Sequence, residues 1–115
     1  MSDCMQTVAI VATASRLDST STPQFEKDMK DQMDAGATRI VCDLAACEYV
    51  ASTALRVILA TARALSRQGG ALALCNARQY VMEVLEIAGF TTILRVYDSV
   101  EDAAAALTSA GGSAQ

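Results

Sequence analysis

Histidine is absent from this 115-residue sequence, and its absence removes several kinds of chemistry. A Ser-His-Asp triad, a Cys-His pair and a phosphohistidine relay are all excluded without it. The glycine-rich patterns that cradle phosphates, G-x-x-x-x-G-K-[ST] and G-x-G-x-x-G, do not occur either. The sequence therefore indicates a protein that is not an enzyme and needs no cofactor.

Four cysteines are present, but their spacing offers no C-x-x-C pair and no four-ligand set for zinc. They are Cys4, Cys42, Cys47 and Cys75. Cys42 and Cys75 stand inside apolar, strand-like runs, where a free cysteine behaves as a small hydrophobic residue. We therefore expect both to be core residues of a protein in a reducing cytosol, with no metal bound.

The balance of charge and hydropathy limits the partners. The formal net charge is −4 and no dense basic run occurs, so neither nucleic acid nor an anionic membrane surface is expected as a partner. No apolar stretch is long enough to span a bilayer. The apolar run at 8–14 has no basic residue before it, which argues against a signal peptide. We expect a cytoplasmic protein that is monomeric in isolation.

Apolar runs and helical patterns alternate along the chain. Apolar runs without polar alternation predict four strands that are buried on both faces, at 8–12, 40–44, 71–75 and 91–96. A looser edge strand is expected before them, at 4–7. Apolar residues three and four apart predict four helices. Thr22 is the expected N-cap of the first, Asn76 of the third and Ser99 of the fourth, and the second covers 52–68.

Strands that alternate with helices imply parallel β-α-β units with right-handed crossovers. The length is that of one domain, and just over half of the residues are apolar, enough to form a core. We predict a single-domain α/β fold, with a mixed sheet of four to five strands covered by about four helices. The domain is expected to span 1–107, followed by a flexible C-terminal tail at 108–115.

The stretch from Asp43 to Leu59 is the one that could carry a function. A buried strand gives way to a short loop, and Ser52 and Thr53 then begin a long amphipathic helix. One interpretation is structural: the Ser52 hydroxyl accepts a hydrogen bond from a first-turn amide and contributes about 1 kcal/mol. The other is functional: the hydroxyl accepts a phosphoryl group, which free amides and the positive end of the helix dipole tolerate. A phosphate dianion at this position would weaken the binding of a partner whose contact with the loop excludes water.

Two short motifs resemble those of the STAS domains of anti-sigma factor antagonists. The family's G-x-L-D motif corresponds to Ser-Arg-Leu-Asp at 15–18, and its D-S-[ST]-G-L-G motif corresponds to Ala-Ser-Thr-Ala-Leu-Arg at 51–56. The hydrophobic run at 57–59 and the Gly-Gly-Ala turn at 69–71 match as well. The similarity extends over about residues 6–107, and the order of strands and helices fits throughout.

The resemblance implies a STAS-like fold with Ser52 as the phosphorylated serine and Thr53 as the second candidate. It implies two partners, a serine kinase of GHKL type that is also an anti-sigma factor, and a metal-dependent serine phosphatase of PP2C type. In this family the unphosphorylated antagonist binds the kinase, which frees a sigma factor, and phosphorylation releases it. The implied partner interface consists of Asp18, Ser19, Ser52, Thr53 and Arg56.

Four positions depart from the family motifs. Ala51 replaces the aspartate before the serine, Ala54 and Arg56 replace the two glycines of the second motif, and Ser15 replaces the glycine of the first. Arg56 places a cation one turn into the helix, where it can stabilise a phosphoserine at 52 or select an acidic partner. The alternative for this arginine is a solvated helix face, which it would share with Arg63 and Arg67.

Two other functions fit parts of the sequence. A STAS module without phosphorylation, acting as a scaffold or as the cytosolic subunit of a transporter, is favoured by Ala51. A receiver-like domain phosphorylated on Asp43 is suggested by the place of this residue at the end of a central strand. A receiver, however, needs paired acidic residues after its first strand, where this chain has Thr-Ala-Ser-Arg. Asp43 is more simply a strand-end residue that binds nearby amides.

Overall fold

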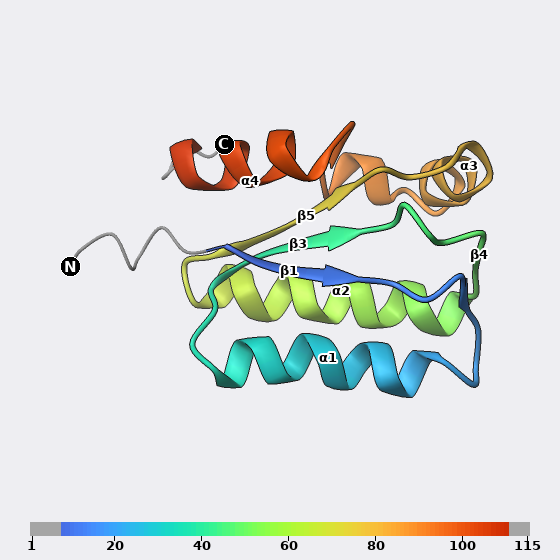
Figure 1. Cartoon of the computed structure of the whole chain (residues 1–115), viewed down its shortest axis with the longest axis horizontal. Helices are drawn as coiled ribbons and strands as arrows, with labels where there is room; N and C mark the ends of the chain where they lie inside the picture. Colours follow the sequence, from blue (N-terminus) through green and yellow to red (C-terminus); the bar gives the residue numbers. More distant parts are fainter. Residues whose placement is uncertain (1–7, 111–115) are drawn as a thin grey trace.

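The computed structural model describes residues 8–110, in which a four-stranded parallel sheet has helices on both faces (Figure 1). The strands are arranged in the order β1-β3-β5-β6 and every pair is parallel; they are β1 (Ala9–Ala12), β3 (Arg39–Asp43), β5 (Ala71–Cys75) and β6 (Val96–Tyr97). Helices α1 (Thr22–Asp34) and α2 (Ser52–Arg67) cover one face. Helix α4 (Val100–Ala110) covers the other over β3 and β5, and α3 (Gln79–Ile87) lies near one end of the sheet. The predicted α/β class and four helices are confirmed.

A second, two-stranded sheet joins the segment between β1 and α1 to the segment between β3 and α2. It pairs β2 (Arg16–Leu17) with β4 (Tyr49–Val50) in parallel. The buried side chains of Leu17 and Val50 anchor it to the core. Each strand has only two residues, too few for a recognisable period, so the sequence pattern did not reveal it. The pairing brings the chain after β1 beside the chain after β3.

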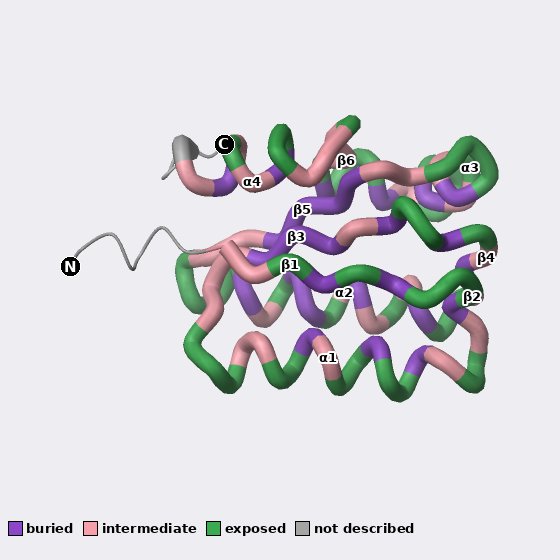
Figure 2. The backbone as a smooth tube through the Cα atoms, viewed as in Figure 1, coloured by how far each residue is buried: buried purple, intermediate pink, exposed green. Residues whose placement is uncertain are grey.

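The central strands are buried on both faces, as their uninterrupted apolar sequences predict. Ile40 and Leu74 point into the cluster beneath α1 and α2, whereas Val41 and Ala73 point into the smaller cluster beneath α4. Figure 2 shows β3 and β5 as the most continuously buried segments of the backbone, while the edge strand β1 alternates between buried and exposed residues. The burial of the central strands therefore follows from the hydrophobic pattern.

The cysteines within the described residues are core residues, as expected for two of them. Cys42, Cys47 and Cys75 are free and buried. Burial is the main cause that raises the pKa of Cys75 to about 11, and it also raises the pKa of the Cys42 thiol. Such thiols stay protonated at neutral pH, so neither is a reactive nucleophile. Cys4 lies outside the described residues.

The segment predicted as a strand at 91–96 is mostly a turn, and this prediction is wrong. A short 3-10 helix, η2 (Phe90–Thr92), follows the left-handed residue Gly89, and only β6 pairs with the sheet. Phe90 and Leu94 are both buried, and the Leu94 amide donates a hydrogen bond to the Phe90 carbonyl. Apolar residues four apart thus reach the core from a turn. The strand expected at 4–7 lies outside the described residues.

Two of the predicted helix caps are also wrong. Thr22 is the first helical residue and follows the N-cap Ser21, and Pro23 stands in the first turn as expected. Asn76 has a positive φ of 59° and binds Asp43 through its side chain, so α3 begins three residues later, after the N-cap Arg78. Asparagine tolerates this left-handed conformation, which a tight strand-to-loop turn requires.

The last helix begins as predicted. The Asp102 amide donates a hydrogen bond of 3.0 Å to Ser99 Oγ, which satisfies one donor of the first turn. Helix α4 continues to Ala110, three residues past the expected domain boundary at 107. In the part of the chain that is described, no helix is long and apolar enough to cross a membrane.

Candidate functional site

The two motifs that the sequence singled out meet at one end of the molecule. The loop that leads into α1 and the start of α2 lie side by side at the end where the strands finish (Figure 1). Two contacts join them: the Ala51 amide donates a 2.8 Å hydrogen bond to the Leu17 carbonyl, and Thr53 Oγ1 lies 3.3 Å from Thr22 Oγ1. The small sheet thus fixes the position of Ser52 relative to Asp18.

Ser52 is the first residue of α2, and its side chain is exposed. The N-cap is Ala51, whose backbone is extended (φ −90°, ψ 164°) and whose side chain cannot accept a hydrogen bond. Within residues 8–110, Ser52 Oγ makes no hydrogen bond. The structural interpretation of this serine as a cap is therefore wrong.

The first turn of α2 has unsatisfied donors next to this free hydroxyl. The amides of Ala54 and Leu55 reach the Ala51 carbonyl at 3.0 and 3.2 Å. The amides of Ser52 and Thr53 belong to the set that has no acceptor inside a helix. Because no side chain caps the helix, these two amides remain available to an anion.

Thr53 is exposed but is already engaged. Its hydroxyl contacts that of Thr22, and Thr22 in turn donates a 2.7 Å hydrogen bond to the Asp18 carbonyl. These contacts connect the start of α2 to the start of α1. Of the two candidate hydroxyls, Ser52 is the one that can be modified without breaking an existing contact.

Asp18 organises the loop that faces Ser52. Its carboxylate accepts hydrogen bonds from the hydroxyl and the amide of Thr20, at 2.6 and 3.0 Å, and from the Ser21 amide at 3.2 Å. The two Thr20 hydrogen bonds are the main causes that lower the pKa of Asp18 to about 2. Ser19, at the tip of this loop, is exposed. Asp18 thus holds the loop in place, and Ser19 is free to contact a partner.

Arg56 is exposed and stands four residues after Ser52, on the same side of α2. In the described part of the chain it forms no ion pair. Arg63 and Arg67 are exposed as well, as expected for a solvated helix face. An anion on Ser52 would have Arg56 as its neighbour along the helix.

The sequence reasoning missed a second cation at this end of the molecule. The Arg16 guanidinium lies 4.6 Å from the centre of the Tyr49 ring, and Arg16 Nε lies 3.4 Å from an Asp18 oxygen. A cation over an aromatic face is attracted to the ring electrons. The two residues are far apart in sequence and meet through the β2–β4 pairing, so no local pattern could have predicted the contact.

Asp43 does not form a receiver-type site. Its carboxylate accepts hydrogen bonds from the Ala45 amide at 3.0 Å and from Asn76 Nδ2 at 3.1 Å. These are the nearby amides that the simpler interpretation requires. No cluster of three or more potential metal ligands of the Cys, Asp, Glu or His type occurs among residues 8–110.

Comparison with known proteins identifies the family of the chain. The STAS domain family model matches residues 3–103. BtrV of Bordetella bronchiseptica, which carries the name of an anti-sigma factor antagonist, is 40% identical over 94 residues, which cover 82% of this chain and 81% of BtrV.

Two solved structures have the same fold. TM1081 of Thermotoga maritima, also named as an anti-sigma factor antagonist, is 25% identical with a TM-score of 0.80, over 87% of this chain and 86% of that one. The Bacillus cell fate determinant SpoIIAA in its phosphorylated form is 16% identical with a TM-score of 0.66, over 84% and 86% of the two chains. At that identity SpoIIAA supports the fold alone.

The chain therefore belongs to the STAS domain family. The resemblance to its anti-sigma factor antagonists, first seen in the motifs at 15–18 and 51–56, is confirmed by these relatives. The motifs differ from the family pattern in their glycines and in the residue before the serine, yet the fold is unchanged.

Proposed function

We propose that this protein is an anti-sigma factor antagonist in a partner-switching pathway, controlled by phosphorylation of Ser52. Unphosphorylated, it binds an anti-sigma factor that is also a serine kinase of GHKL type. Phosphorylation releases it, and a PP2C-type serine phosphatase restores the binding form. The name of its 40% identical relative BtrV supports the general role.

The observation that carries the proposal is the free hydroxyl of Ser52 beside two unsatisfied amides. Ser52 is exposed, uncapped and without a hydrogen bond in the described residues, so a kinase can reach it without unfolding α2. The amides and the helix dipole accommodate the phosphate that results.

The switch needs no change of fold. The proposed contact surface consists of Asp18, Ser19, Ser52, Thr53 and Arg56, which come from the two loops joined by the β2–β4 sheet. A partner packed against this surface covers Ser52 and excludes water. A phosphate there must either be desolvated or meet acidic groups of the partner, and both outcomes weaken the complex.

Phosphorylation by the cognate kinase tests the acceptor. The wild-type chain, Ser52→Ala and Thr53→Val are incubated with the kinase and radiolabelled ATP. Label is expected in the wild type and in Thr53→Val, and is expected to be lost in Ser52→Ala. Equal incorporation into Ser52→Ala would rule out Ser52, and loss only in Thr53→Val would move the site by one residue.

Binding of the same kinase tests the switch. Ser52→Asp is expected to weaken binding by at least about tenfold, because a charge left in a dry contact costs more than about 1.4 kcal/mol. Ser66→Asp is the matched control, since Ser66 is also exposed on α2 but lies about 21 Å further along the helix. If both variants bind as the wild type does, the charge mechanism is wrong.

A further inference from the structure

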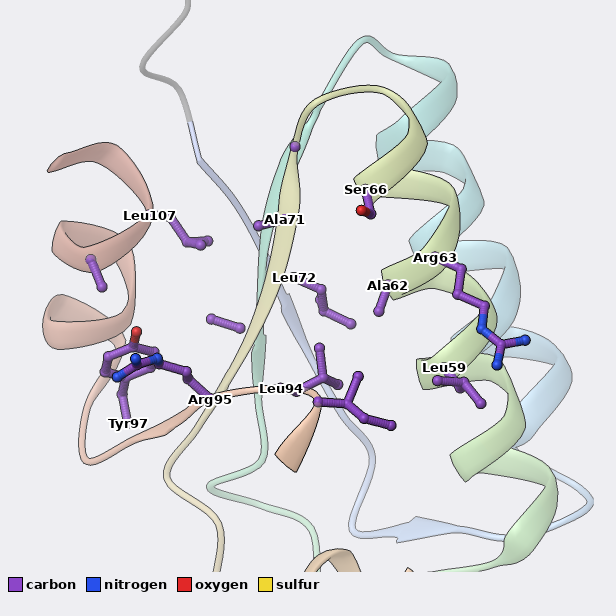
Figure 3. Close-up of a pocket in the computed structure, with 14 residues that line it drawn as sticks. Leu59, Ala62, Arg63, Ser66, Ala71, Leu72, Leu94, Arg95, Tyr97 and Leu107 are labelled. Carbon is purple, nitrogen blue, oxygen red and sulfur yellow. The ribbon is translucent and has the colours of Figure 1, made fainter. Parts of the chain in front are cut away.

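A groove of about 800 Å³ opens at the opposite end of α2 from Ser52, and the proposed function makes no use of it. It lies at the edge of the sheet, between the later turns of α2 and helix α4 (Figure 3). Its floor and walls are largely apolar; they include Leu59, Leu72, Leu94 and Leu107. Pockets of this volume, mainly hydrophobic with a few polar groups, are typical of small-molecule sites.

The groove exists because β6 is too short to cover its neighbour. β6 pairs only with Leu74 and Cys75 of β5, and the chain before it turns away through η2. The amides of Leu74 and Asn76 bind carbonyls on this side of β5. By the alternation of a strand, the Leu72 amide and carbonyl point to the same side, where the described residues supply no partner. One unpaired donor and one unpaired acceptor therefore face the groove.

The charged residues that line the groove are both cations. Arg63 comes from α2 and Arg95 from the segment before β6, and Figure 3 shows them on opposite sides of Leu72 and Leu94. Neither forms an ion pair within residues 8–110. Figure 3 shows their side chains pointing away from each other, so each flank of the groove carries one unpaired guanidinium group. No acidic residue lines the groove, so either arginine can pair with an anion there.

The apolar wall also has an exposed surface that a ligand would cover. Ile93 lines the groove and is 58% exposed, which is high for a large hydrophobic residue. A ligand that covers Ile93 and the leucines while it reaches one of the arginines needs an apolar body and an anionic head.

We propose that this groove binds a small amphipathic carboxylate, such as a medium-chain fatty acid. The alkyl chain lies against Leu59, Ile93 and Leu94, and the carboxylate pairs with Arg63 or Arg95. A peptide strand fits less well, because the open edge of β5 offers the backbone groups of Leu72 alone and an added strand needs several such pairs. This inference goes beyond the proposed function and does not depend on it.

Titration of the ¹⁵N-labelled full chain with sodium decanoate, followed by NMR, tests the proposal. Saturable shifts are expected at the amides of Leu72, Leu94 and Arg95, and none at Ser52. Decanol, which has the same tail without the charge, and decyltrimethylammonium, which carries the opposite charge, are expected to bind at least about tenfold more weakly.

Arginine variants give the matched control. Arg63→Gln and Arg95→Gln are each expected to weaken decanoate binding at least about threefold, and the double variant about tenfold. Arg67→Gln removes another exposed arginine of α2, one that does not line the groove, and is expected to leave decanoate binding unchanged. These surface changes leave the core intact, so each variant remains folded.

Three results would overturn the assignment. Decanoate could fail to saturate at millimolar concentration, decanol could bind as tightly as decanoate, or Arg67→Gln could weaken binding as much as Arg63→Gln. Shifts at the Leu72 amide with an acidic peptide, in the absence of any with decanoate, would instead assign the groove to strand addition.

Discussion

Phosphorylation of Ser52 is expected to stabilise the isolated domain while it weakens partner binding. The phosphate would stand at the first residue of α2, beside amides that have no acceptor inside the helix, and four residues before Arg56. Both neighbours favour negative charge. The phosphorylation that weakens the complex would therefore stabilise the folded domain.

The magnitude follows from two surface interactions. A negative charge in the first turn of an exposed helix contributes about 0.3–1 kcal/mol. An ion pair with Arg56 at the i, i+4 spacing contributes about 0.3–0.5 kcal/mol. Together they amount to about 1 kcal/mol, which corresponds to a rise in Tm of about 4 °C for a domain of this size.

Calorimetry of the phosphorylated and unphosphorylated chains measures this difference. Arg56→Gln is expected to remove about a third of the gain, and the remainder is expected to shrink as salt is added, since both interactions are exposed. Arg67→Gln, at the far end of the same helix, is the control and leaves the gain unchanged.

Two outcomes would refute the reasoning. If phosphorylation lowered Tm, Ser52 would not stand at an open helix N-terminus in solution. If the gain were the same in Arg56→Gln and insensitive to salt, electrostatics at this turn would not be its cause.

Three further predictions concern the fold around the site. In Gly70→Ala the new Cβ would overlap the Thr38 carbonyl, so we expect the free energy of unfolding in urea to fall by about 3 kcal/mol. Gly69 lies in open space with a φ that asparagine tolerates, so the control Gly69→Asn is expected to cost less than about 1 kcal/mol. Equal losses in the two variants would contradict the clash. Because the pKa of Asp18 is lowered, the stabilising effect of its carboxylate is fully present above pH 3.8 and is lost as the pH falls to about 2. The difference in unfolding free energy between the wild type and Asp18→Asn is therefore expected to shrink over that range. A difference that stayed constant would contradict this role of the Asp18 carboxylate. Ala51→Asp supplies the missing cap and is expected to raise the free energy of unfolding in urea by about 1 kcal/mol. No gain in the same assay would mean that α2 is already capped.

Local patterns predicted the central elements of the fold closely. The strand expected at 71–75 is β5, and the helix expected at 52–68 is α2 at Ser52–Arg67. Both are governed by interactions between near neighbours: an uninterrupted apolar run for a doubly buried strand, and apolar residues three and four apart for an amphipathic helix. The position of Ser52 at a helix start could be predicted for the same reason.

The sequence was less informative where a residue's role depends on a distant segment. Asparagine is a residue type that often caps helices, but the side chain of Asn76 binds Asp43 and its backbone adopts a left-handed conformation instead. Phe90 and Leu94 lie in and beside an apolar run that predicts a strand, yet both side chains are buried in the core from a turn. In each case tertiary contacts outweighed local preference.

The amino-acid sequence by itself determined the α/β class, the family and the serine at the mouth of the second helix, because these depend on order and spacing along the chain. Only the tertiary structure decided that Ser52 is free rather than a cap, that Thr53 is tied to Thr22, and that β6 leaves a groove beside Leu72. These facts arise from pairings between segments far apart in sequence, and such pairings leave no periodic trace in either segment.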